Sequence, residues 1–258
     1  MDKPRLFLNS LARGFQMLDI VCNNPVSFGL SELAKECGFN ISTIQRISYT
    51  LQEIGIIDRD LKTKKFRIGP KMIALASAAM QNIELKKIAF PIMSELSSDI
   101  NEVVGLGVIS GNDLVLIEII LNTQQVLNIS LSPGETVPVH TTAMGKAILA
   151  HLPQSELDDF LANTKLTRLT SNTITSIKAL KSQLKKVKAS GFATAFDESS
   201  YGLSSIASPI RDNRGNVIAA LSIMIPTIRA NEDSPIISYH KKLLLASNQI
   251  SFSIGYRE

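Results

Sequence analysis

The amino-terminal quarter of the chain contains the segment LSELAKECGFNISTIQRISYTLQEIG at residues 30–55. Apolar side chains between Leu30 and Cys37 repeat at the spacing of one face of a short helix. Gly38-Phe39-Asn40 follows, and glycine tolerates the backbone conformation just past a helix end while asparagine caps the start of the next helix. The segment therefore predicts two helices joined by a tight turn.

The second of these helices is expected to run from about Asn40 to Ile54, with two different faces. Its apolar stripe consists of Ile44, Ile47, Leu51 and Ile54. The rest of its surface offers hydroxyls, an amide, a guanidinium and an aromatic ring, which are groups that reach base edges and phosphates in a major groove. The predicted DNA contacts of this helix are Ser42, Thr43, Gln45, Arg46 and Tyr49.

Two short β-rich runs, Ile56–Arg59 and Phe66–Ile68, flank a lysine-rich tip directly after this helix. An amphipathic helix with Leu8, Leu11, Phe15, Leu18 and Cys22 on its apolar face precedes the turn. This order of elements is typical of a winged helix-turn-helix domain, although a small helical domain without a ligand would have the same elements. The predicted contacts of the hairpin with the DNA backbone are Lys62, Lys64, Lys65 and Arg67.

Basic residues are concentrated in the same part of the chain. Residues 1–71 contain 11 Lys and Arg against 7 Asp and Glu, whereas residues 72–258 contain 16 of each, so the net charge of +4 falls entirely in the first quarter. This distribution favours a polyanion-binding module joined to a neutral body, and a solvated charged hairpin is the alternative.

The composition excludes several classes of protein. With 258 residues, 45% hydrophobic and 19% charged, the chain has the balance of a globular protein with a substantial core. It has no apolar run of about 18–20 residues, as a membrane span requires, and no signal-peptide pattern. Cys22 and Cys37 fit apolar helix positions, and we expect reduced core thiols of a cytoplasmic protein. Neither a metal site nor a cofactor is predicted.

The remainder of the chain alternates between helix and strand patterns. Ser110-Gly111-Asn112-Asp113 predicts a hairpin between Val103–Ile109 and Leu114–Leu121, and Val126–Leu131 is expected to be a further strand. Adjacent hairpins with interspersed helices indicate an α+β domain with a mostly antiparallel sheet. Later strands are expected near 192–196, 206–210 and 217–225, and helices near 84–96, 143–150, 156–162, 176–189 and 236–251.

Several segments resemble one known family. They are Ser10–Gly14, Leu30–Ala34, Ser42–Arg46, Leu51–Ile57, Phe66–Pro70, Pro138–Ala147, Gly191–Ala193, Gly202–Ala207 and Ala219–Ile223. Together they resemble the IclR family of bacterial transcriptional regulators over nearly the whole chain. The resemblance implies a winged helix-turn-helix DNA-binding domain at residues 1–69, a linker helix at 70–82, and a GAF/PAS-like domain for effector binding and oligomerisation at 83–258.

The resemblance also implies the partners: a double-stranded DNA operator, a small organic acid as effector, and a second copy of the chain in a homodimer or homotetramer. The opening Ser10-Leu11-Ala12-Arg13-Gly14 resembles the subgroup that senses aromatic acids and β-ketoadipate-pathway metabolites. That subgroup often has Gly-Leu-Arg-Ser where this chain has Gly202-Leu203-Ser204-Ser205, so a guanidinium that could bind a carboxylate is absent here.

A small-molecule site is expected where the loop Pro133–Thr142 runs into a helix. Amide groups at a helix start and nearby hydroxyls can bind the carboxylate of a small acid, and apolar side chains can contact the rest of that ligand. These positions match the family's ligand-contacting positions, and the resemblance adds an acidic loop at Asp197-Glu198. The predicted effector residues are Val126, Ile129, Val137, Thr142, Ala143, Met144, Asp197, Leu203, Ser205 and Ser222.

No catalytic residues are predicted, and we expect the protein not to be an enzyme. His140 could act as a base, but the sequence identifies no carboxylate partner for it, and a structural histidine is the simpler interpretation. Two other hypotheses stay open. One is an enzyme that acts on a small carboxylate and carries a basic amino-terminal appendage; the other is an architectural DNA-binding protein whose carboxyl-terminal body only oligomerises.

Overall fold

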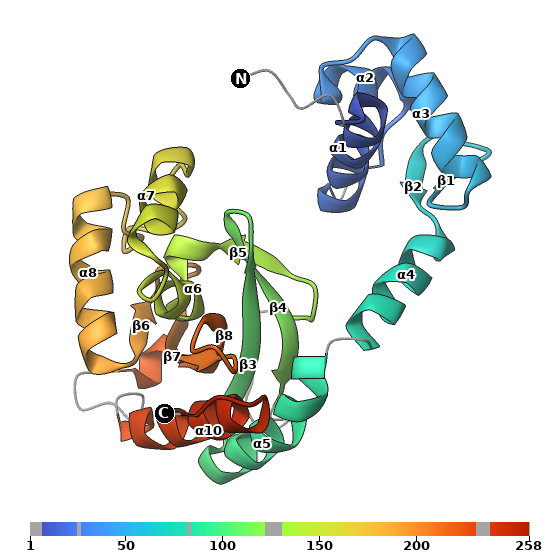
Figure 1. Ribbon diagram of the computed structural model, residues 1–258. Helices are drawn as coiled ribbons and strands as arrows, with labels where there is room; N and C mark the ends of the chain where they lie inside the picture. The colour runs from blue at the N-terminus through green and yellow to red at the C-terminus, as the bar shows by residue number, and fades with distance from the viewer. Residues whose placement is uncertain (1–6, 25–26, 82–83, 122–130, 231–237, 258) are drawn as a thin grey trace. The chain divides into compact units, whose positions relative to one another are not determined.

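The computed structural model describes residues 7–24, 27–81, 84–121, 131–230 and 238–257 (Figure 1). The chain divides into two compact units, the amino-terminal unit Met1–Asn82 and the carboxyl-terminal unit Ile83–Glu258. None of the described helices has both the length and the apolar composition that a membrane span requires.

The amino-terminal unit consists of helices and one two-stranded hairpin. Its elements are α1 (Asn9–Asn23), α2 (Leu30–Cys37), α3 (Ile41–Glu53), β1 (Ile57–Arg59), β2 (Phe66–Ile68) and α4 (Pro70–Gln81). Met17, Leu33, Ile44 and Phe66 come from four of these elements and are at most 1% exposed. One apolar core therefore joins α1, α2, α3 and the hairpin.

The turn between α2 and α3 forms as its sequence predicts. Gly38 has a φ of 68°, in the left-handed region, and its N–H donates to the carbonyl oxygen of Lys35. Asn40 caps α3, because its Oδ1 accepts a hydrogen bond of 2.8 Å from the backbone N–H of Thr43. The predicted helix-turn-helix is confirmed.

The apolar faces of α1 and α3 differ in part from the prediction. Leu8, Leu11 and Phe15 are 67%, 59% and 58% exposed, because only the carboxyl-terminal half of α1 packs against the core. Cys22, in the last turn of α1, is also exposed, so the prediction of a buried thiol there was wrong, whereas Cys37 is buried. Ile54 is 46% exposed and lies just past the end of α3 at Glu53, so it does not belong to the buried side of the helix.

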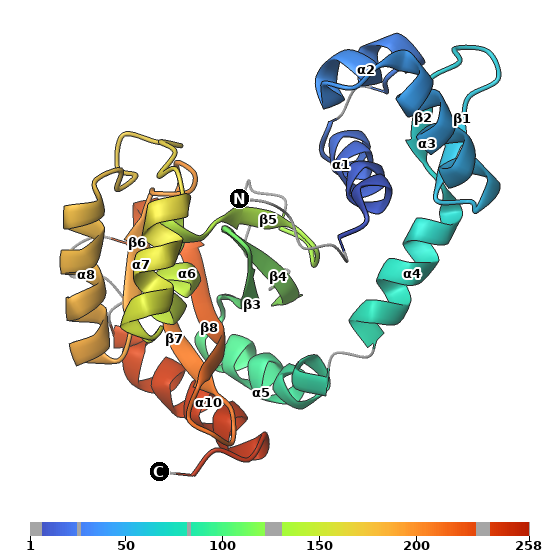
Figure 2. The same ribbon diagram turned by 45° about the horizontal axis from the view of Figure 1, so that its top comes forward.

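The carboxyl-terminal unit is built on a sheet of six strands in the order β5-β4-β3-β8-β7-β6 (Figure 2). Every neighbouring pair of strands is antiparallel. The strands are β3 (Val103–Ser110), β4 (Asp113–Ile120), β5 (Thr136–Pro138), β6 (Ala193–Phe196), β7 (Leu203–Arg211) and β8 (Val217–Pro226).

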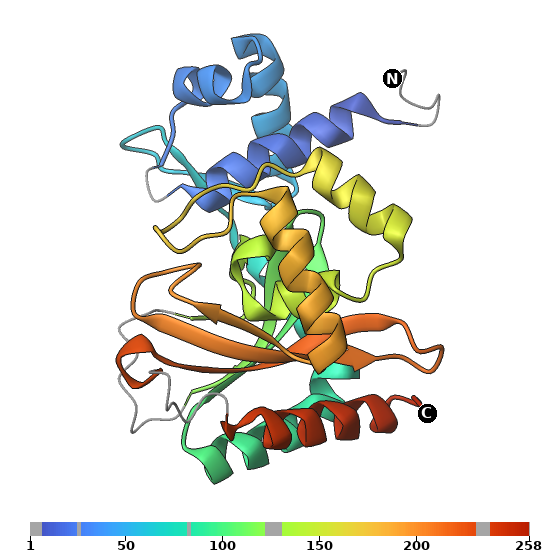
Figure 3. The ribbon, with the colours of Figure 1, turned by 90° about the vertical axis from the view of Figure 1, so that its left-hand side faces the viewer.

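Helices cover both faces of this sheet, as Figure 3 shows. The helices are α5 (Glu84–Ile100), α6 (Ala143–Leu149), α7 (Gln154–Asn163), α8 (Ile177–Ser190) and α10 (His240–Ser253), with single turns of 3-10 helix at η1 (Val139–Thr141) and η2 (Thr227–Arg229). Successive side chains of a strand point to opposite faces, so Leu221 and Ile223 pack with α5 and α10, whereas Ala220 packs with α6 and α8.

The predicted α+β class with an antiparallel sheet is confirmed. The short strand β5 lies within the segment expected to be a loop, and β7 begins at Leu203, before the expected residue 206. The strand expected at Val126–Leu131 lies almost wholly outside the described residues.

Candidate DNA interface and candidate effector site

The outer face of α3 is polar and does not pack against the core. Ile44 and Ser48 are buried, and they hold the opposite side of the helix against α1, α2 and the hairpin. Thr43 is half-buried, and its backbone N–H donates to the Asn40 cap. The other predicted contacts are all exposed: Ser42, Gln45, Arg46 and Tyr49.

The hairpin tip is shaped by one carboxylate. Asp60 Oδ1 accepts hydrogen bonds from the backbone N–H groups of Lys62 (3.0 Å) and Thr63 (2.6 Å), and these bonds lower the pKa of Asp60. Lys64 adopts a left-handed φ of 58°, which closes the turn. Lys62 and Lys64 are exposed and Lys65 is half-buried. Asp60 thereby fixes the backbone from which three predicted phosphate contacts extend.

Arg67 differs from the free cation that the sequence predicts. It lies opposite Asp58 in the register of the hairpin, and its Nη2 and Nε donate to Asp58 Oδ2 at 2.6 Å and 3.0 Å. This pairing lowers the pKa of Asp58. Arg59, which was not among the predicted contacts, donates to the carbonyl oxygen of Lys64 and lies over the ring of Phe66. Both arginines therefore stabilise the hairpin itself.

Small side chains meet on the face of the sheet that α6 covers. Gly105 on β3 lies opposite Ser222 on β8, which in turn lies opposite Ala207 on β7. Ser222 is buried, and its hydroxyl lies 3.5 Å from the carbonyl oxygen of Gly105. A Cβ at Gly105 would lie 2.6 Å from the Met224 methyl group, so a larger residue here would require that side chain to move. This row, with one hydroxyl at its centre, is called the small-residue row.

Apolar side chains border the small-residue row. Val103, Leu203 and Met224 form a buried cluster, against which Ile119 and Leu131 pack. Because alternate residues of a strand share a face, Ser205 lies on the same side of β7 as Leu203 and Ala207. Of the predicted effector residues, the structure brings five onto this side of the sheet: Ala143, Met144, Leu203, Ser205 and Ser222.

α6 starts in a tightly packed position. Thr142 Oγ1 caps it by accepting a 2.9 Å hydrogen bond from the N–H of Gly145. Gly145 lies so close to η1 that a Cβ would come within 2.0 Å of the Val139 carbonyl oxygen. Ala143 and Met144 are thereby pressed against the sheet, and the sulfur of Met144 lies next to Gly107.

The other predicted effector residues are placed differently. Val137 lies on the edge strand β5, where it pairs with Leu114 of β4. Its strand is three positions from β8, which carries Ser222, so the two strands are about 14 Å apart at ordinary strand spacing. Asp197 Oδ1 accepts bonds from the N–H of Gly202 (2.7 Å) and the hydroxyl of Thr227 (2.6 Å), so it holds the β6–β7 loop closed. Val126 and Ile129 lie outside the described residues.

A buried ion pair connects α6 to the β6–β7 loop, and the sequence prediction missed it. Lys146 Nζ donates to Glu198 Oε1 at 2.5 Å and to the carbonyl oxygen of Thr194 at 3.0 Å, and the side chains are 0% and 8% exposed. Burial lowers the pKa of Lys146 and raises that of Glu198, while their mutual attraction opposes both shifts. A lone lysine in the apolar segment Ala143–Ala150 was the available indication, since a buried lysine needs a partner.

The loop Thr170–Thr173 covers the same region through side-chain hydrogen bonds. Thr173 Oγ1 donates to the carbonyl oxygen of Glu198 at 2.7 Å, and Asn172 Nδ2 donates to that of Phe196 at 3.3 Å. His140 is fully buried, its Nε2 lies 3.0 Å from the carbonyl oxygen of Thr167, and burial lowers its pKa. This geometry gives His140 a structural contact within the fold.

Comparison with known proteins identifies both halves of the chain. Residues 10–61 match the IclR helix-turn-helix domain, and residues 77–252 match the carboxyl-terminal domain of bacterial IclR transcriptional regulators. The chain is 30% identical over 258 residues to the transcriptional regulator KdgR of Escherichia coli K12, covering 100% of this chain and 97% of that protein. It is 29% identical over 249 residues to the regulator XynR of the same organism, covering 96% and 98%.

Solved structures agree with these matches. Thermotoga maritima IclR has a TM-score of 0.70 and 29% identity, with 97% of this chain and 100% of that chain covered. An IclR homologue from Microbacterium hydrocarbonoxydans in complex with 4-hydroxybenzoate has a TM-score of 0.76 and 26% identity, with 95% and 99% covered. This chain therefore belongs to the IclR family of bacterial transcriptional regulators, with a helix-turn-helix DNA-binding domain and a carboxyl-terminal effector-binding domain.

Proposed function

We propose that the outer face of α3 enters the major groove of an operator. Ser42, Gln45 and Arg46 contact base edges or adjacent phosphates, with Thr43 and Tyr49 beside them. The observation that carries this proposal is the two-sided character of α3, which is buried on one side and exposed and polar on the other. The hairpin adds phosphate contacts from Lys62, Lys64, Lys65 and Arg67, the last with its charge partly balanced by Asp58.

Selection of binding sites from a random-sequence DNA library, followed by binding assays with variants, tests this interface. Arg46→Ala should cost about 1–3 kcal/mol of binding free energy and relax specificity at one base position. Alanine at Lys62 or Lys64 should lower the slope of log K against log salt by about 0.9 for each phosphate that the protein no longer neutralises. A uniform loss of affinity with Arg46→Ala would make that residue a phosphate contact, and unchanged slopes would remove the hairpin from the interface.

The effector is proposed to be a small organic acid that binds over the small-residue row and changes the affinity for DNA. Support comes from the Ser222 hydroxyl, from Ser205 on the same face, and from the apolar border around them. The homologue solved with 4-hydroxybenzoate supports this chemical class. Binding without turnover is expected, because the chain's relatives are regulators.

A thermal-shift screen of small carboxylates, including 4-hydroxybenzoate, followed by product analysis, tests the effector proposal. An acid that binds only the folded state at 100 times its Kd should stabilise it by about 2.7 kcal/mol. Ser222→Ala should abolish the shift. Ser208→Ala is the matched control, because Ser208 is equally buried but bonds to Ser247 of α10 on the opposite face. Formation of a product would favour an enzyme, and the absence of any binding acid would favour an architectural protein.

The protein is also proposed to act as a homo-oligomer in the cytoplasm. The exposed apolar side chains Leu11 and Phe15 of α1, with Leu8 directly before the helix, support an interface between copies, since exposed apolar patches often mark interaction sites. A two-fold dimer would contact half-sites separated by about one turn of DNA or a multiple of it. Effector binding would then favour one of two pre-existing arrangements of the DNA-binding domains.

A further inference from the structure

Charge is distributed very unevenly within the carboxyl-terminal unit. Residues 160–196 contain seven Lys and Arg and no Asp or Glu, although residues 72–258 as a whole contain 16 of each kind. Five of the seven basic residues belong to α8, and they are Lys178, Lys181, Lys185, Lys186 and Lys188. Although the net charge of residues 72–258 is zero, α8 is strongly cationic.

The lysines of α8 lie on the half of the helix that faces away from the core. Leu180, Leu184 and Val187 form its buried side, and residues three or four positions apart share a face. In Figure 3, no described element of the carboxyl-terminal unit covers the outer side of α8. Lys178, Lys181 and Lys185 surround one shallow hollow together with Ile177 and Ser182.

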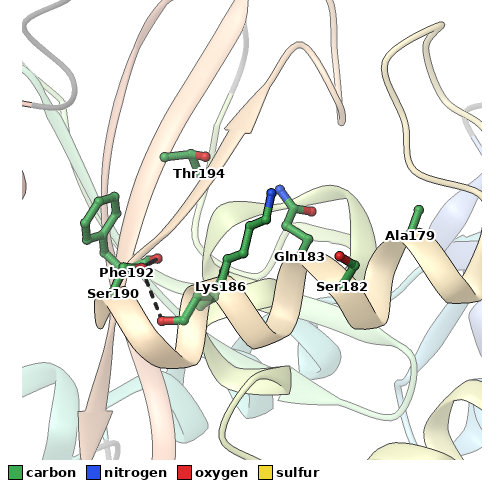
Figure 4. Close-up of a pocket in the computed structure, with 8 residues that line it drawn as sticks. Ala179, Ser182, Gln183, Lys186, Ser190, Phe192 and Thr194 are labelled. Atoms are coloured by element: carbon green, nitrogen blue, oxygen red, sulfur yellow. Dashed lines mark hydrogen bonds between the residues drawn. The ribbon is translucent and has the colours of Figure 1, made fainter.

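A second hollow, of about 390 Å³, lies on the flank of α8 that faces β6. Figure 4 shows the side chains of Lys186 and Gln183 next to each other, both directed toward Thr194. The cationic surface therefore extends around the helix from Lys178 to Lys186.

This arrangement opposes the stability of the helix. Lys178, Lys181, Lys185 and Lys188 are successive like-charged neighbours at i, i+3 or i+4, which repel one another. Lys178 lies in the first turn, where a positive charge interacts unfavourably with the helix dipole. Among the described residues, Lys181 is the one lysine of α8 in an ion pair, with Asp158 at 2.6 Å. Solvent screens part of this repulsion, and an anionic partner bound along this face would offset it further.

We propose that this lysine face of α8 is a second DNA-contacting surface, which binds backbone phosphates without reading bases. Lysine is a flexible point charge, which suits contacts with phosphates that do not depend on sequence. Lys178 and Lys188 are ten residues apart, or about 15 Å along the helix, and B-DNA carries one charge per about 1.7 Å of its axis. Several phosphates are therefore within reach of one helix face. The choice of DNA as partner rests on the family's DNA-binding function.

The test uses the full chain and a 60-bp duplex of arbitrary sequence, with binding measured by fluorescence anisotropy over a range of salt concentrations. The variant is Lys178→Gln with Lys185→Gln and Lys188→Gln, which leaves the Lys181–Asp158 pair intact. We expect its salt slope to fall by about 0.9 for each phosphate left unneutralised, up to about 2.7 for all three. Arginine at the same three positions should keep the slope of the wild type.

A control removes three exposed lysines from other helices of the same unit: Lys87→Gln, Lys241→Gln and Lys242→Gln. Lys242 pairs with Asp99 at 2.8 Å, so Lys87→Gln with Lys241→Gln serves as a second control that breaks no ion pair. The slope of each control should equal that of the wild type. If the α8 variant also keeps the wild-type slope, or the slope of either control falls as much, the proposal is wrong, and an acidic protein becomes the better candidate partner. Unfolding does not explain a loss of binding, because relieving repulsion should leave the midpoint of thermal unfolding unchanged or higher.

Failure of this proposal is distinguishable from failure of the α3 and hairpin interface. Lys62→Gln with Lys64→Gln should lower the salt slope independently of α8. A lower slope in that variant with no change in the α8 variant overturns the second surface alone, and an unchanged slope in both variants overturns the proposed hairpin contacts as well.

Discussion

Replacing Lys146 with methionine would leave the Glu198 carboxylate without its cation at a site where the side chain is only 8% exposed. Removing one partner of a buried ion pair typically costs about 3–5 kcal/mol, since the remaining charge stays desolvated. The matched control is Lys181→Met, which breaks the Lys181–Asp158 pair, whose side chains are 42% and 48% exposed. An exposed pair contributes about 0–1 kcal/mol, so the two variants should differ by several kcal/mol in the free energy of unfolding.

The destabilisation should also depend on pH. Burial raises the pKa of Glu198 even in the presence of Lys146, and removing the cation raises it further. A carboxyl whose folded-state pKa is raised binds its proton more tightly in the folded chain, so its contribution is favourable at low pH and is lost as pH rises through that pKa. Lys146→Met should therefore be closest to the wild type in acid and lose stability toward neutral pH.

Urea denaturation of the full chain, followed by circular dichroism at several pH values, measures both effects, and amide hydrogen exchange at β6 localises them. The double variant Lys146→Met, Glu198→Met should recover most of the stability, because an apolar pair of similar size can replace a buried ion pair. If Lys146→Met costs no more than Lys181→Met and shows no pH trend, the pair is not the buried electrostatic contact described here.

Three further predictions concern other parts of the chain. Asn40→Ala should cost about 0.5–2 kcal/mol of stability by removing the α3 cap, whereas Asn40→Asp should keep the cap; equal losses in thermal unfolding would contradict this. Gly145→Ala should cost about 1–3 kcal/mol or more, because its Cβ would lie 2.0 Å from a backbone oxygen; an unchanged unfolding midpoint would refute the close contact. Leu11→Lys should leave the unfolding midpoint within a degree or two but reduce the mass found by sedimentation, and an unchanged mass would exclude α1 from the interface between copies.

The sequence was informative where the structure depends on neighbouring residues. Gly38 and Asn40 determine the turn between α2 and α3 by their own backbone preferences and hydrogen bonds. The apolar periodicity of α8 predicted one face made of Ile177, Leu180, Leu184 and Val187. The last three are buried, whereas Ile177, in the first turn, is 44% exposed.

Contacts between distant residues could not be predicted in the same way. Lys146 and Glu198 are 52 positions apart, and nothing local to either residue identifies its partner. Arg67 and Asp58 face each other only once the register of the hairpin is known. The exposure of Leu8 and Leu11 depends on how much of α1 the core can cover, which is a property of the packed unit.

The edge strand β6 is already hydrogen-bonded on its outer side, and this affects how the sheet can associate with other strands. Its carbonyl groups at Thr194 and Phe196 already accept hydrogen bonds from the side chains of Lys146 and Asn172, so a seventh strand would have to compete for them. A foreign strand that approached this border would first have to displace a buried ammonium group. The sheet is thereby protected against fibrous growth along this side.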